Sequence, residues 1–541
     1  MRNVLKALLF LLFAQSAAAA DDPRGNLASA EWLEKNRQSE NLVLIDASFG
    51  RAHAAKHIPG AINVDIAFGV RDPEARELEG RLQSWGVSAG KKVVIYDGGG
   101  TYLATRLFFD FYYAGFPPAD LYVLDGGLAK WEALGLPVTK EPTPAQKKGT
   151  FRVAAVKEEA RVRLPEFLAA SGDPKNHAVV EALEPTYHFG AQKFFDRAGH
   201  VPNAIMLPSE DFYNADKTFK SPDEIRRMAK YLGITPEQTV HSYCGGGIAA
   251  SVPQFALQFI AGYPKVKLYI ESQREWLRDE RTLPLWTYDA PYLMRDMAWL
   301  DGWGGRMQRM FGVANLSVVD VRPAESYKQG HVPFALNLPA DVFRKHLASP
   351  EKLAEILGPA GVDASHEAVI VSEGGLNERS ALAFLMLERL GQKKVSILLG
   401  SVDDWGLRGY QLSQEPTVVG PKKSPMDLAI PPGTYRASVR QDVLVRTAAG
   451  TQGQYPKVYL ASGKQLPAKS PDAKVLHVPY SELLDANGTP KAAKDIWAIL
   501  TKAGLPRYAE VIVYADDPGE AAVNYVILKL MGYPDVKVLM L

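Results

Sequence analysis

The chain has 541 residues and is expected to fold as three or four domains of about 150 residues each. Hydrophobic residues make up 47% of it and charged residues 23%, which is typical of globular domains and excludes a disordered or fibrous protein. The formal net charge of +1 offers no basic or acidic excess, so we expect neither nucleic acid nor an anionic membrane surface as a partner.

The first predicted element is a secretory signal peptide over residues 1–20. Arg2 and Lys6 form a basic start, the apolar run ALLFLLFAQSA follows, and a run of four alanines ends at Ala20. The apolar run is short for a membrane span, which argues against the alternative of a membrane anchor. We therefore expect cleavage before Asp21, a periplasmic or secreted location, and no membrane attachment of the mature chain.

After the leader, one pattern recurs four times along the chain. Each copy has an apolar run rich in β-branched residues, a polar or glycine-rich turn, and a stretch with helical spacing. The copies are KKVVIYDGGGTYLATRLFF from Lys91, QTVHSYCGGGIAASVPQFALQF from Gln238, HEAVIVSEGGLNERSALAFLML from His366 and AEVIVYADDPGEAAVNYVIL from Ala509. Buried strands that alternate with helices predict an α/β fold with parallel sheets.

Further motifs flank these copies. A strand that ends in an acidic residue comes before the first three, as in LVLIDASFGRAHAAKHIPGAINV from Leu42, and the fourth keeps only AKVLHVPYSELL from Ala473. A tail such as LYVLDGGLAKWEALGLP from Leu121 follows the first three. Segments rich in proline and polar residues (139–150, 281–292 and 412–425) separate the copies as linkers. We therefore predict four domains, at residues 22–140, 151–287, 288–412 and 426–541.

Together these motifs resemble the rhodanese (sulfurtransferase) family, strongly in domains 1 to 3 and weakly in domain 4. The resemblance implies tandem rhodanese-like domains, each a five-stranded parallel sheet with helices on both faces. When the glycine-rich turns are aligned, Cys244 of domain 2 is matched by Asp97, Glu373 and Ala515 in domains 1, 3 and 4. Cys244 is the only cysteine of the chain, so only domain 2 is expected to be active.

The turn around Cys244 suits a reactive thiolate. It follows a parallel strand, at the sheet edge where ligands bind. Backbone N–H groups of Gly245, Gly246 and Gly247 can converge on one point because glycine tolerates the required angles. Such a nest is expected to lower the thiol pKa below its free value of about 8.5 and to stabilise a persulfide anion. The alternative, a small buried hydrophobic side chain, is the common fate of an isolated free cysteine.

Other residues take roles from the resemblance or from their repetition. In the family, an arginine before the Gly-His-Ile-Pro turn holds the anionic sulfur donor, and Arg197 matches it. We expect His200 to build a turn rather than to catalyse, Glu181 to support the site from behind, and Trp131, Trp276 and Trp405 to pack in the cores. The predicted site is the nucleophile Cys244 with the substrate-binding residues Arg197, Gly245, Gly246, Gly247, Ile248 and Ala249.

The leading hypothesis is an exported sulfurtransferase. Cys244 takes sulfane sulfur from a small-molecule donor, thiosulfate or 3-mercaptopyruvate, and passes it as a persulfide to cyanide or a thiol, which can be a thiol protein. The neutral residues after Cys244 leave the donor open. No metal or organic cofactor is expected, because no Cys/His cluster stands out.

Two alternatives remain at this stage. One is a sulfane-sulfur carrier or binding scaffold without turnover, which three domains without a cysteine favour. The other, a Cdc25-like phosphatase, is weaker because the loop has no arginine to clamp a phosphoryl group. We expect residues 22–287 to be the smallest active piece, with domain 1 closing one wall of the Cys244 site.

Overall fold

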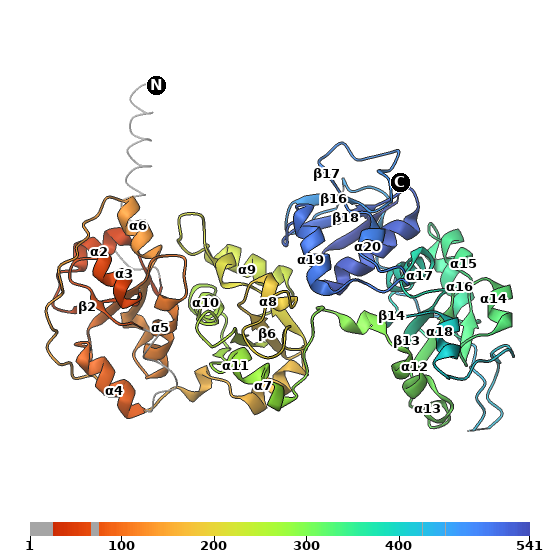
Figure 1. Cartoon of the computed structure of the whole chain (residues 1–541), viewed down its shortest axis with the longest axis horizontal. Coiled ribbons are helices and arrows are strands. Elements are labelled where there is room, and N and C mark those ends of the chain that lie inside the picture. Colours follow the sequence, from red (N-terminus) through yellow and green to blue (C-terminus); the bar gives the residue numbers. More distant parts are fainter. Residues whose placement is uncertain (1–24, 66–74, 425, 450, 541) are drawn as a thin grey trace. The chain divides into compact units, whose positions relative to one another are not determined.

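The computed structural model describes residues 25–65, 75–424, 426–449 and 451–540. The chain divides into two compact parts, Met1–Trp286 and Thr287–Leu541, called here the N-terminal and C-terminal halves. Figure 1 colours them from red to yellow-green and from green to blue. The predicted signal peptide and its cleavage site lie outside the described residues. Within the described part of the chain, no helix combines the length and apolar character that a membrane span needs.

Domain 1 is a parallel five-stranded sheet in the order β1-β5-β4-β2-β3. Its strands are β1 (Leu27–Ala28), β2 (Leu42–Asp46), β3 (Ile62–Asn63), β4 (Lys92–Tyr96) and β5 (Leu121–Leu124). Its α-helices are α2 (Ala30–Asn36), α3 (Gly50–Ala55), α4 (Ala75–Ser84), α5 (Leu103–Tyr113) and α6 (Gly127–Ala133). The central strands are buried along nearly their whole length, as expected for apolar runs covered on both faces.

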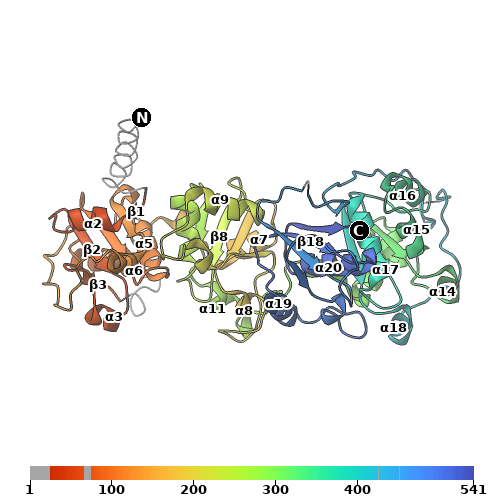
Figure 2. The same cartoon turned by 90° about the horizontal axis from the view of Figure 1, so that it is seen from above.

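Domain 2 has the parallel sheet order β7-β6-β8-β9. Its strands are β6 (His177–Glu181), β7 (Ala204–Met206), β8 (Thr239–Tyr243) and β9 (Val266–Leu268), with β8 labelled in Figure 2. A single parallel bridge from Arg161 to Leu268 takes the place of the fifth strand. The α-helices are α7 (Leu164–Ser171), α8 (Pro185–His188), α9 (Pro222–Tyr231), α10 (Ser251–Phe255) and α11 (Ser272–Trp276), and α10 continues as a π-helix over Ala256–Ile260.

Domain 3 has the sheet order β10-β14-β13-β11-β12, which repeats that of domain 1. The strands are β10 (Met294–Arg295), β11 (Leu316–Asp320), β12 (Ala335–Asn337), β13 (Glu367–Val371) and β14 (Lys394–Leu398). The α-helices are α12 (Met297–Gly304), α13 (Arg306–Met310), α14 (Ala324–Gln329), α15 (Ala340–Lys345), α16 (Pro350–Leu357), α17 (Glu378–Arg389) and α18 (Val402–Leu407).

Domain 4, the weakest copy in sequence, has the same strand order, β15-β19-β18-β16-β17. The strands are β15 (Leu444–Val445), β16 (Lys457–Ala461), β17 (Val475–His477), β18 (Glu510–Tyr514) and β19 (Val536–Leu539). The α-helices are α19 (Ala493–Lys502) and α20 (Pro518–Leu530). The predicted α/β class with parallel sheets is therefore confirmed in all four domains.

The strand pairing identifies equivalent positions and corrects one prediction. In each domain the last residue of the central strand pairs with the last residue of the strand beside it. The four pairs are Tyr96 with Asp46, Tyr243 with Glu181, Val371 with Asp320, and Tyr514 with Ala461. The next residues are Asp97, Cys244, Ser372 and Ala515. The prediction that Glu373 matches Cys244 is therefore wrong by one residue. The alignment followed the glycines, and the third loop has one glycine fewer.

The two domains of each half pack through the helices that follow these loops. In the N-terminal half, Phe108 of α5 meets Phe255 of α10 edge to face, with ring centroids 4.7 Å apart. The hydroxyls of Thr105 and Ser251 form a 2.8 Å hydrogen bond beside them. In the C-terminal half, α17 packs along α20 in the corresponding way. Each half is thus built as a pair of domains.

The three tryptophans predicted to be core residues are buried in equivalent places. Trp131, Trp276 and Trp405 are at most 2% exposed. Each indole N–H donates to a backbone carbonyl six to eight residues further along, at Pro137, Pro284 and Gln411. The segment that follows the last helix of each of domains 1 to 3 therefore folds back over its own domain.

A buried histidine makes the stability of the N-terminal half depend on pH. His241 of β8 is 0% exposed, and its Nε2 lies 3.0 Å from Nδ1 of His177. Burial, with His177 and Lys267 nearby, lowers the His241 pKa from 6.5 to about 3. Since the folded protein excludes this proton, the stabilising contribution is complete above pH 6.5 and is lost as the pH falls below it.

We expect the N-terminal half to lose up to about 2 kcal/mol of unfolding free energy between pH 6.5 and about pH 5. In His241→Gln, which cannot take up a proton, the loss should be smaller. Urea denaturation at the two pH values measures the change in unfolding free energy of each protein. An equal change in the wild type and in His241→Gln would contradict this role of His241.

Candidate active site

Cys244 follows β8 directly, at the carboxyl edge of the domain 2 sheet, and is only 2% exposed. Its sulfur accepts a hydrogen bond from the backbone N–H of Gly247 at 3.2 Å. Its own N–H donates to the Ser272 hydroxyl at 3.0 Å, and that hydroxyl donates to the Tyr269 carbonyl at 2.7 Å. The sulfur is therefore held in one place, with an N–H donor aimed at it.

The equivalent loop of domain 1 demonstrates that this backbone gathers N–H groups around the side chain. The Asp97 carboxylate accepts from the N–H groups of Gly99, Leu103 and Ala104 at 2.8 to 3.1 Å and from the Thr101 hydroxyl at 2.6 Å. An anion at this position is thus well stabilised. In domain 2, the N–H group that the structure describes as donating to the sulfur is that of Gly247. Of the three predicted glycine donors, it is thus Gly247 that reaches the sulfur.

A pocket of about 450 Å³ opens above Cys244. Of the six predicted substrate-binding residues, four line it, namely Gly245, Gly246, Ile248 and Ala249, whereas Gly247 and Arg197 do not. The other lining residues are Tyr102, Ala182, Leu183, Glu184, Tyr187, Phe194, Phe195, Ser209 and Glu210. Tyr102 belongs to domain 1, and the Ser251 hydroxyl reaches its carbonyl at 3.4 Å. Domain 1 therefore closes part of the pocket wall, as predicted.

Two residues at unusual backbone angles hold the loop against α11. Gly247 has φ of +80°, and a Cβ there would lie 2.2 Å from the Ile270 carbonyl oxygen. Ser272 has φ of +52°, a rare value for a residue with a side chain. Glycine stands at this place in domain 1 (Gly127, φ +53°). At this strained position a serine provides the hydroxyl that accepts the Cys244 N–H and so fixes Cys244. Sequence reasoning missed this role.

The structure does not bring Arg197 to the pocket. Its guanidinium donates to the carbonyls of Leu283 and Trp276, both at 2.6 Å, and Arg197 is not among the lining residues. These contacts fasten the tail of domain 2 to the turn before His200. Two of its donors are committed to the backbone, so the geometry favours a structural role, and donor binding by Arg197 stays a prediction.

Among the residues that the structure describes, one group of side chains could hold a metal. Glu181, His188 and His200 are fully buried, and each offers a ligand atom within 4.8 Å of the others. His188 Nδ1 lies 2.5 Å from the Glu181 carboxylate, and the His200 ring stacks on His188 with centroids 3.7 Å apart. The Glu181 carboxylate also accepts from the Gln273 amide at 2.7 Å.

The same arrangement in the other domains favours packing over metal binding. In domain 1, His53 lies 2.8 Å from Asp46 and stacks on His57. In domain 3, Tyr327 holds the place of His53 and stacks on His331, although its ring offers no nitrogen ligand. In each of domains 1 to 3, Nδ1 of the second residue of the pair, a histidine, donates to the backbone carbonyl of the first at 2.8 or 2.9 Å. This supports the turn-building role predicted for His200.

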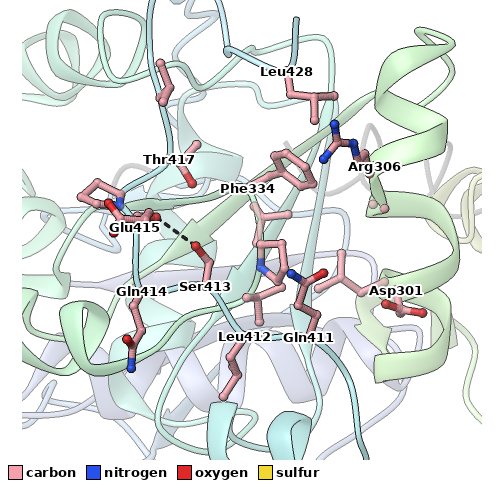
Figure 3. A pocket seen from close by; sticks show the side chains of 18 of the residues that line it. Asp301, Arg306, Phe334, Gln411, Leu412, Ser413, Gln414, Glu415, Thr417 and Leu428 are labelled. Carbon is pink, nitrogen blue, oxygen red and sulfur yellow. Dashed lines mark hydrogen bonds between the residues drawn. The ribbon is translucent and has the colours of Figure 1, made fainter. Parts of the chain in front are cut away.

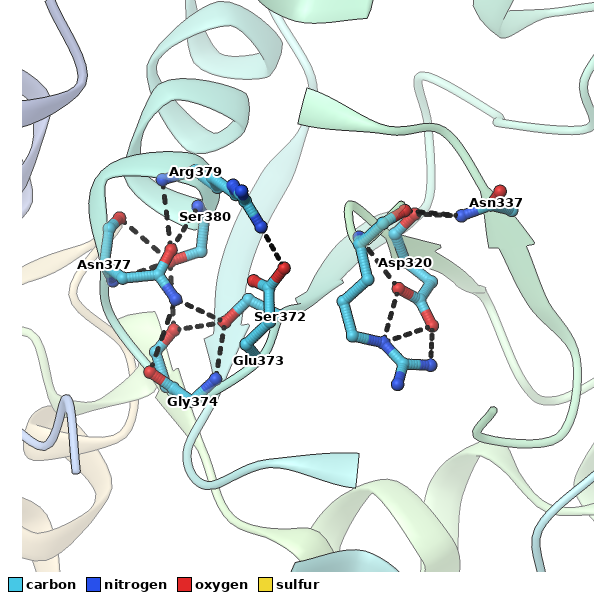
Figure 4. Close-up of polar contacts among 10 residues, drawn as sticks. Asp320, Asn337, Ser372, Glu373, Gly374, Asn377, Arg379 and Ser380 are labelled. Atoms are coloured by element: carbon cyan, nitrogen blue, oxygen red, sulfur yellow. Dashed lines mark hydrogen bonds and ion pairs between the residues drawn. The ribbon is translucent and has the colours of Figure 1, made fainter. Parts of the chain in front are cut away.

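The third loop shows what replaces the thiol in domain 3 (Figure 4). The Ser372 hydroxyl, at the position of Cys244, is fully buried and donates to the Gly375 carbonyl at 2.8 Å. Glu373 points outward and pairs with Arg379. A turn of domain 4 around Gly488, in the segment before α19, packs on this loop. The Leu376 N–H donates to the Gly488 carbonyl there at 2.9 Å. The Ser372 hydroxyl is thus committed to the loop itself.

Domain 3 has a different pocket, of about 640 Å³, between the α12–α13 segment, the turn at Val332–Phe334 and the segment 411–418 (Figure 3). The Ser413 hydroxyl donates to the Glu415 carbonyl at its wall, at 3.0 Å. Neither Ser372 nor Glu373 lines it. It is therefore not the counterpart of the Cys244 pocket.

Domain 2 is thus an α/β domain with a lone thiol at the floor of a pocket, at the carboxyl edge of its parallel sheet. The family described as the rhodanese-like domain matches residues 29–134, 166–279 and 305–407. These matches cover more than half of the chain, so the chain belongs to the rhodanese-like family. The predicted family is confirmed.

Relatives described as a probable sulfurtransferase and as a sulfur carrier each match about half of the chain. A probable 3-mercaptopyruvate sulfurtransferase of Pseudomonas aeruginosa is 29% identical over 285 residues, which is 47% of this chain and 96% of that protein. A sulfur carrier protein of Thermus thermophilus is 29% identical over 267 residues, 46% of this chain and 93% of that protein. The solved 3-mercaptopyruvate sulfurtransferase SseA of Escherichia coli is 24% identical, with a TM-score of 0.42 over 46% of this chain and 99% of that chain.

Proposed function

We propose that the protein is an exported sulfurtransferase that moves sulfane sulfur through a persulfide on Cys244. The observation that carries the proposal is the position of the only cysteine, at the floor of a pocket with the Gly247 N–H directed at its sulfur. Export rests on the signal peptide predicted over residues 1–20, from which we propose a periplasmic or secreted location for the mature chain. The mature N-terminus, read by intact mass, should be Asp21.

The chemistry has two steps that balance without a cofactor. The Cys244 thiolate attacks the outer sulfur of thiosulfate, the S–S bond breaks, and sulfite leaves with the electron pair. With 3-mercaptopyruvate the C–S bond breaks instead, and pyruvate leaves after its enolate takes up a proton. In the second step, cyanide or a thiolate attacks the outer sulfur of the persulfide, and Cys244 returns to the thiolate.

A non-turnover sulfur carrier is the second candidate, and the Thermus relative favours it by its description. The two candidates differ in turnover. Purified protein should transfer sulfur from thiosulfate or 3-mercaptopyruvate to cyanide over many cycles if it is an enzyme. Transfer that stops after one sulfur per Cys244 would identify a carrier, and no loading from either donor would contradict both candidates.

The division of the chain predicts where the activity lies. Because the N-terminal half is compact by itself and holds all the pocket residues, a fragment of residues 22–287 should keep most of the full-length turnover. Domain 2 alone, residues 151–287, should be far weaker, since it loses Tyr102 and exposes Phe255. Steady-state kinetics with circular dichroism tests this, and a folded but inactive 22–287 fragment would contradict it.

A further inference from the structure

The residues around Cys244 have an uneven distribution of charge. Two carboxylate side chains, Glu184 and Glu210, line the pocket, and both residues are exposed to solvent. Among its described lining residues there is no lysine, arginine or histidine. Arg197, the cation predicted to meet an anionic donor, is tied to the tail of the domain. The described lining of the pocket thus holds two carboxylates and no cationic side chain.

An aromatic wall stands beside these carboxylates. The rings of Tyr187 and Phe194 stack in parallel, 4.1 Å apart and tilted by 4°. The Phe194 ring lies directly over the loop, because a Cβ on Gly245 would be 3.1 Å from it. Phe194 is 54% exposed and Tyr102, from domain 1, is 42% exposed, so both present surface to an entering molecule. Aromatic faces and carboxylates are the groups that proteins use to bind organic cations.

The loaded form of the site would keep this preference. A persulfide anion on Cys244 carries the same single negative charge as the thiolate that it replaces, beside two carboxylates and, in the described lining, no cation. An anionic acceptor, like the anionic donor of the first step, would approach against repulsion, whereas a cationic acceptor would be drawn in.

Resting on the proposed function, we propose that the pocket selects a cationic sulfur acceptor, a thiol that carries an ammonium group. The cation lies beside the Glu184 carboxylate, against the open surface of the Tyr187–Phe194 stack. The thiolate of the same molecule attacks the outer sulfur of the Cys244 persulfide. A new S–S bond forms on the acceptor, the bond to Cys244 breaks, and the acceptor's thiol proton has gone to solvent.

The charge preference can be measured without sulfur transfer, because Cys244 is the only thiol in the chain. The probes are two methanethiosulfonates of similar size, one with a trimethylammonium ethyl group and one with a sulfonate ethyl group. Labelling rates, each divided by the rate with a free small thiol, should favour the cation by at least about tenfold. Glu184→Gln should reduce this ratio. Glu40→Gln, an exposed carboxylate of domain 1 outside the pocket, should not.

The acceptor is tested on protein already loaded with persulfide. Cysteamine, 2-mercaptoethanol and 3-mercaptopropionate differ mainly in charge, and each rate is divided by the rate of the same thiol with a small-molecule persulfide. Cysteamine should discharge the persulfide fastest and 3-mercaptopropionate slowest. Phe194→Leu, which keeps an apolar side chain but loses the ring, should reduce the difference in discharge rate between cysteamine and 3-mercaptopropionate.

The outcomes separate this inference from the function beneath it. Failure of Cys244 to form a persulfide would contradict the proposed function, while a labelling ratio in favour of the cation would still support a cation-selective pocket. Persulfide that forms but discharges equally with all three thiols would overturn the cationic acceptor alone. A labelling ratio near one, or in favour of the sulfonate, would overturn the inference whether or not the protein transfers sulfur.

Discussion

Cys244→Ser should abolish both persulfide formation and sulfur transfer. A serine hydroxyl is close in shape to the thiol and can accept the Gly247 N–H in the same way, so the loop should fold normally. An alcohol oxygen cannot take up and release sulfane sulfur, and no other cysteine exists to replace it. Transfer from thiosulfate to cyanide should fall to the uncatalysed rate.

The control for this variant is its stability. Thermal unfolding of Cys244→Ser should match that of the wild type, because the pocket and its hydrogen bonds keep the same geometry. Transfer near the wild-type rate in a folded Cys244→Ser protein would remove the thiol from the mechanism altogether.

Gly247→Ala should have the second largest effect, on both folding and activity. Alanine would have to adopt φ of +80° with its Cβ 2.2 Å from the Ile270 carbonyl oxygen, so the loop must move away from the segment before α11. We expect a loss of at least about 2 kcal/mol of unfolding free energy. The movement also withdraws the N–H that now points at the Cys244 sulfur, which should slow persulfide formation.

Gly246→Ala is the matched control for stability. A Cβ at Gly246 meets no atom within 4 Å, and its φ does not lie in the left-handed region. Chemical denaturation should therefore show a change within about 0.5 kcal/mol for this variant. Equal destabilisation by the two substitutions would contradict the steric account of Gly247.

The sequence predicts the fold well because the signal is local. Buried strands, glycine-rich turns and amphipathic helices follow each other within about twenty residues, and four copies reinforce one pattern. The candidate nucleophile can be proposed from the sequence for the same reason, since Cys244 stands alone among 541 residues at the end of such a strand. The misplacement of Glu373 at the position of Ser372 comes from counting glycines, whereas strand pairing sets the position.

The rest of the site depends on contacts that are distant in sequence. Tyr102 enters the pocket from 142 positions before Cys244, through the packing of one domain on another. Arg197 is taken up by carbonyls 79 and 86 residues further along. An insertion separates His188 from His200 and hides the histidine pair that domain 1 shows at a spacing of four. A comparison of residues seven positions after Asp46, Glu181 and Asp320 would have found His188.

The most direct test of the account is the mass of the intact protein before and after a sulfur donor, followed by an acceptor thiol. After thiosulfate or 3-mercaptopyruvate, the mass should rise by one sulfur atom, and peptide mapping should place that atom on Cys244. A thiol should then return the protein to its original mass, and the cycle should repeat with turnover. Protein whose mass does not change with either donor would contradict the assignment of Cys244 as the sulfur-carrying nucleophile.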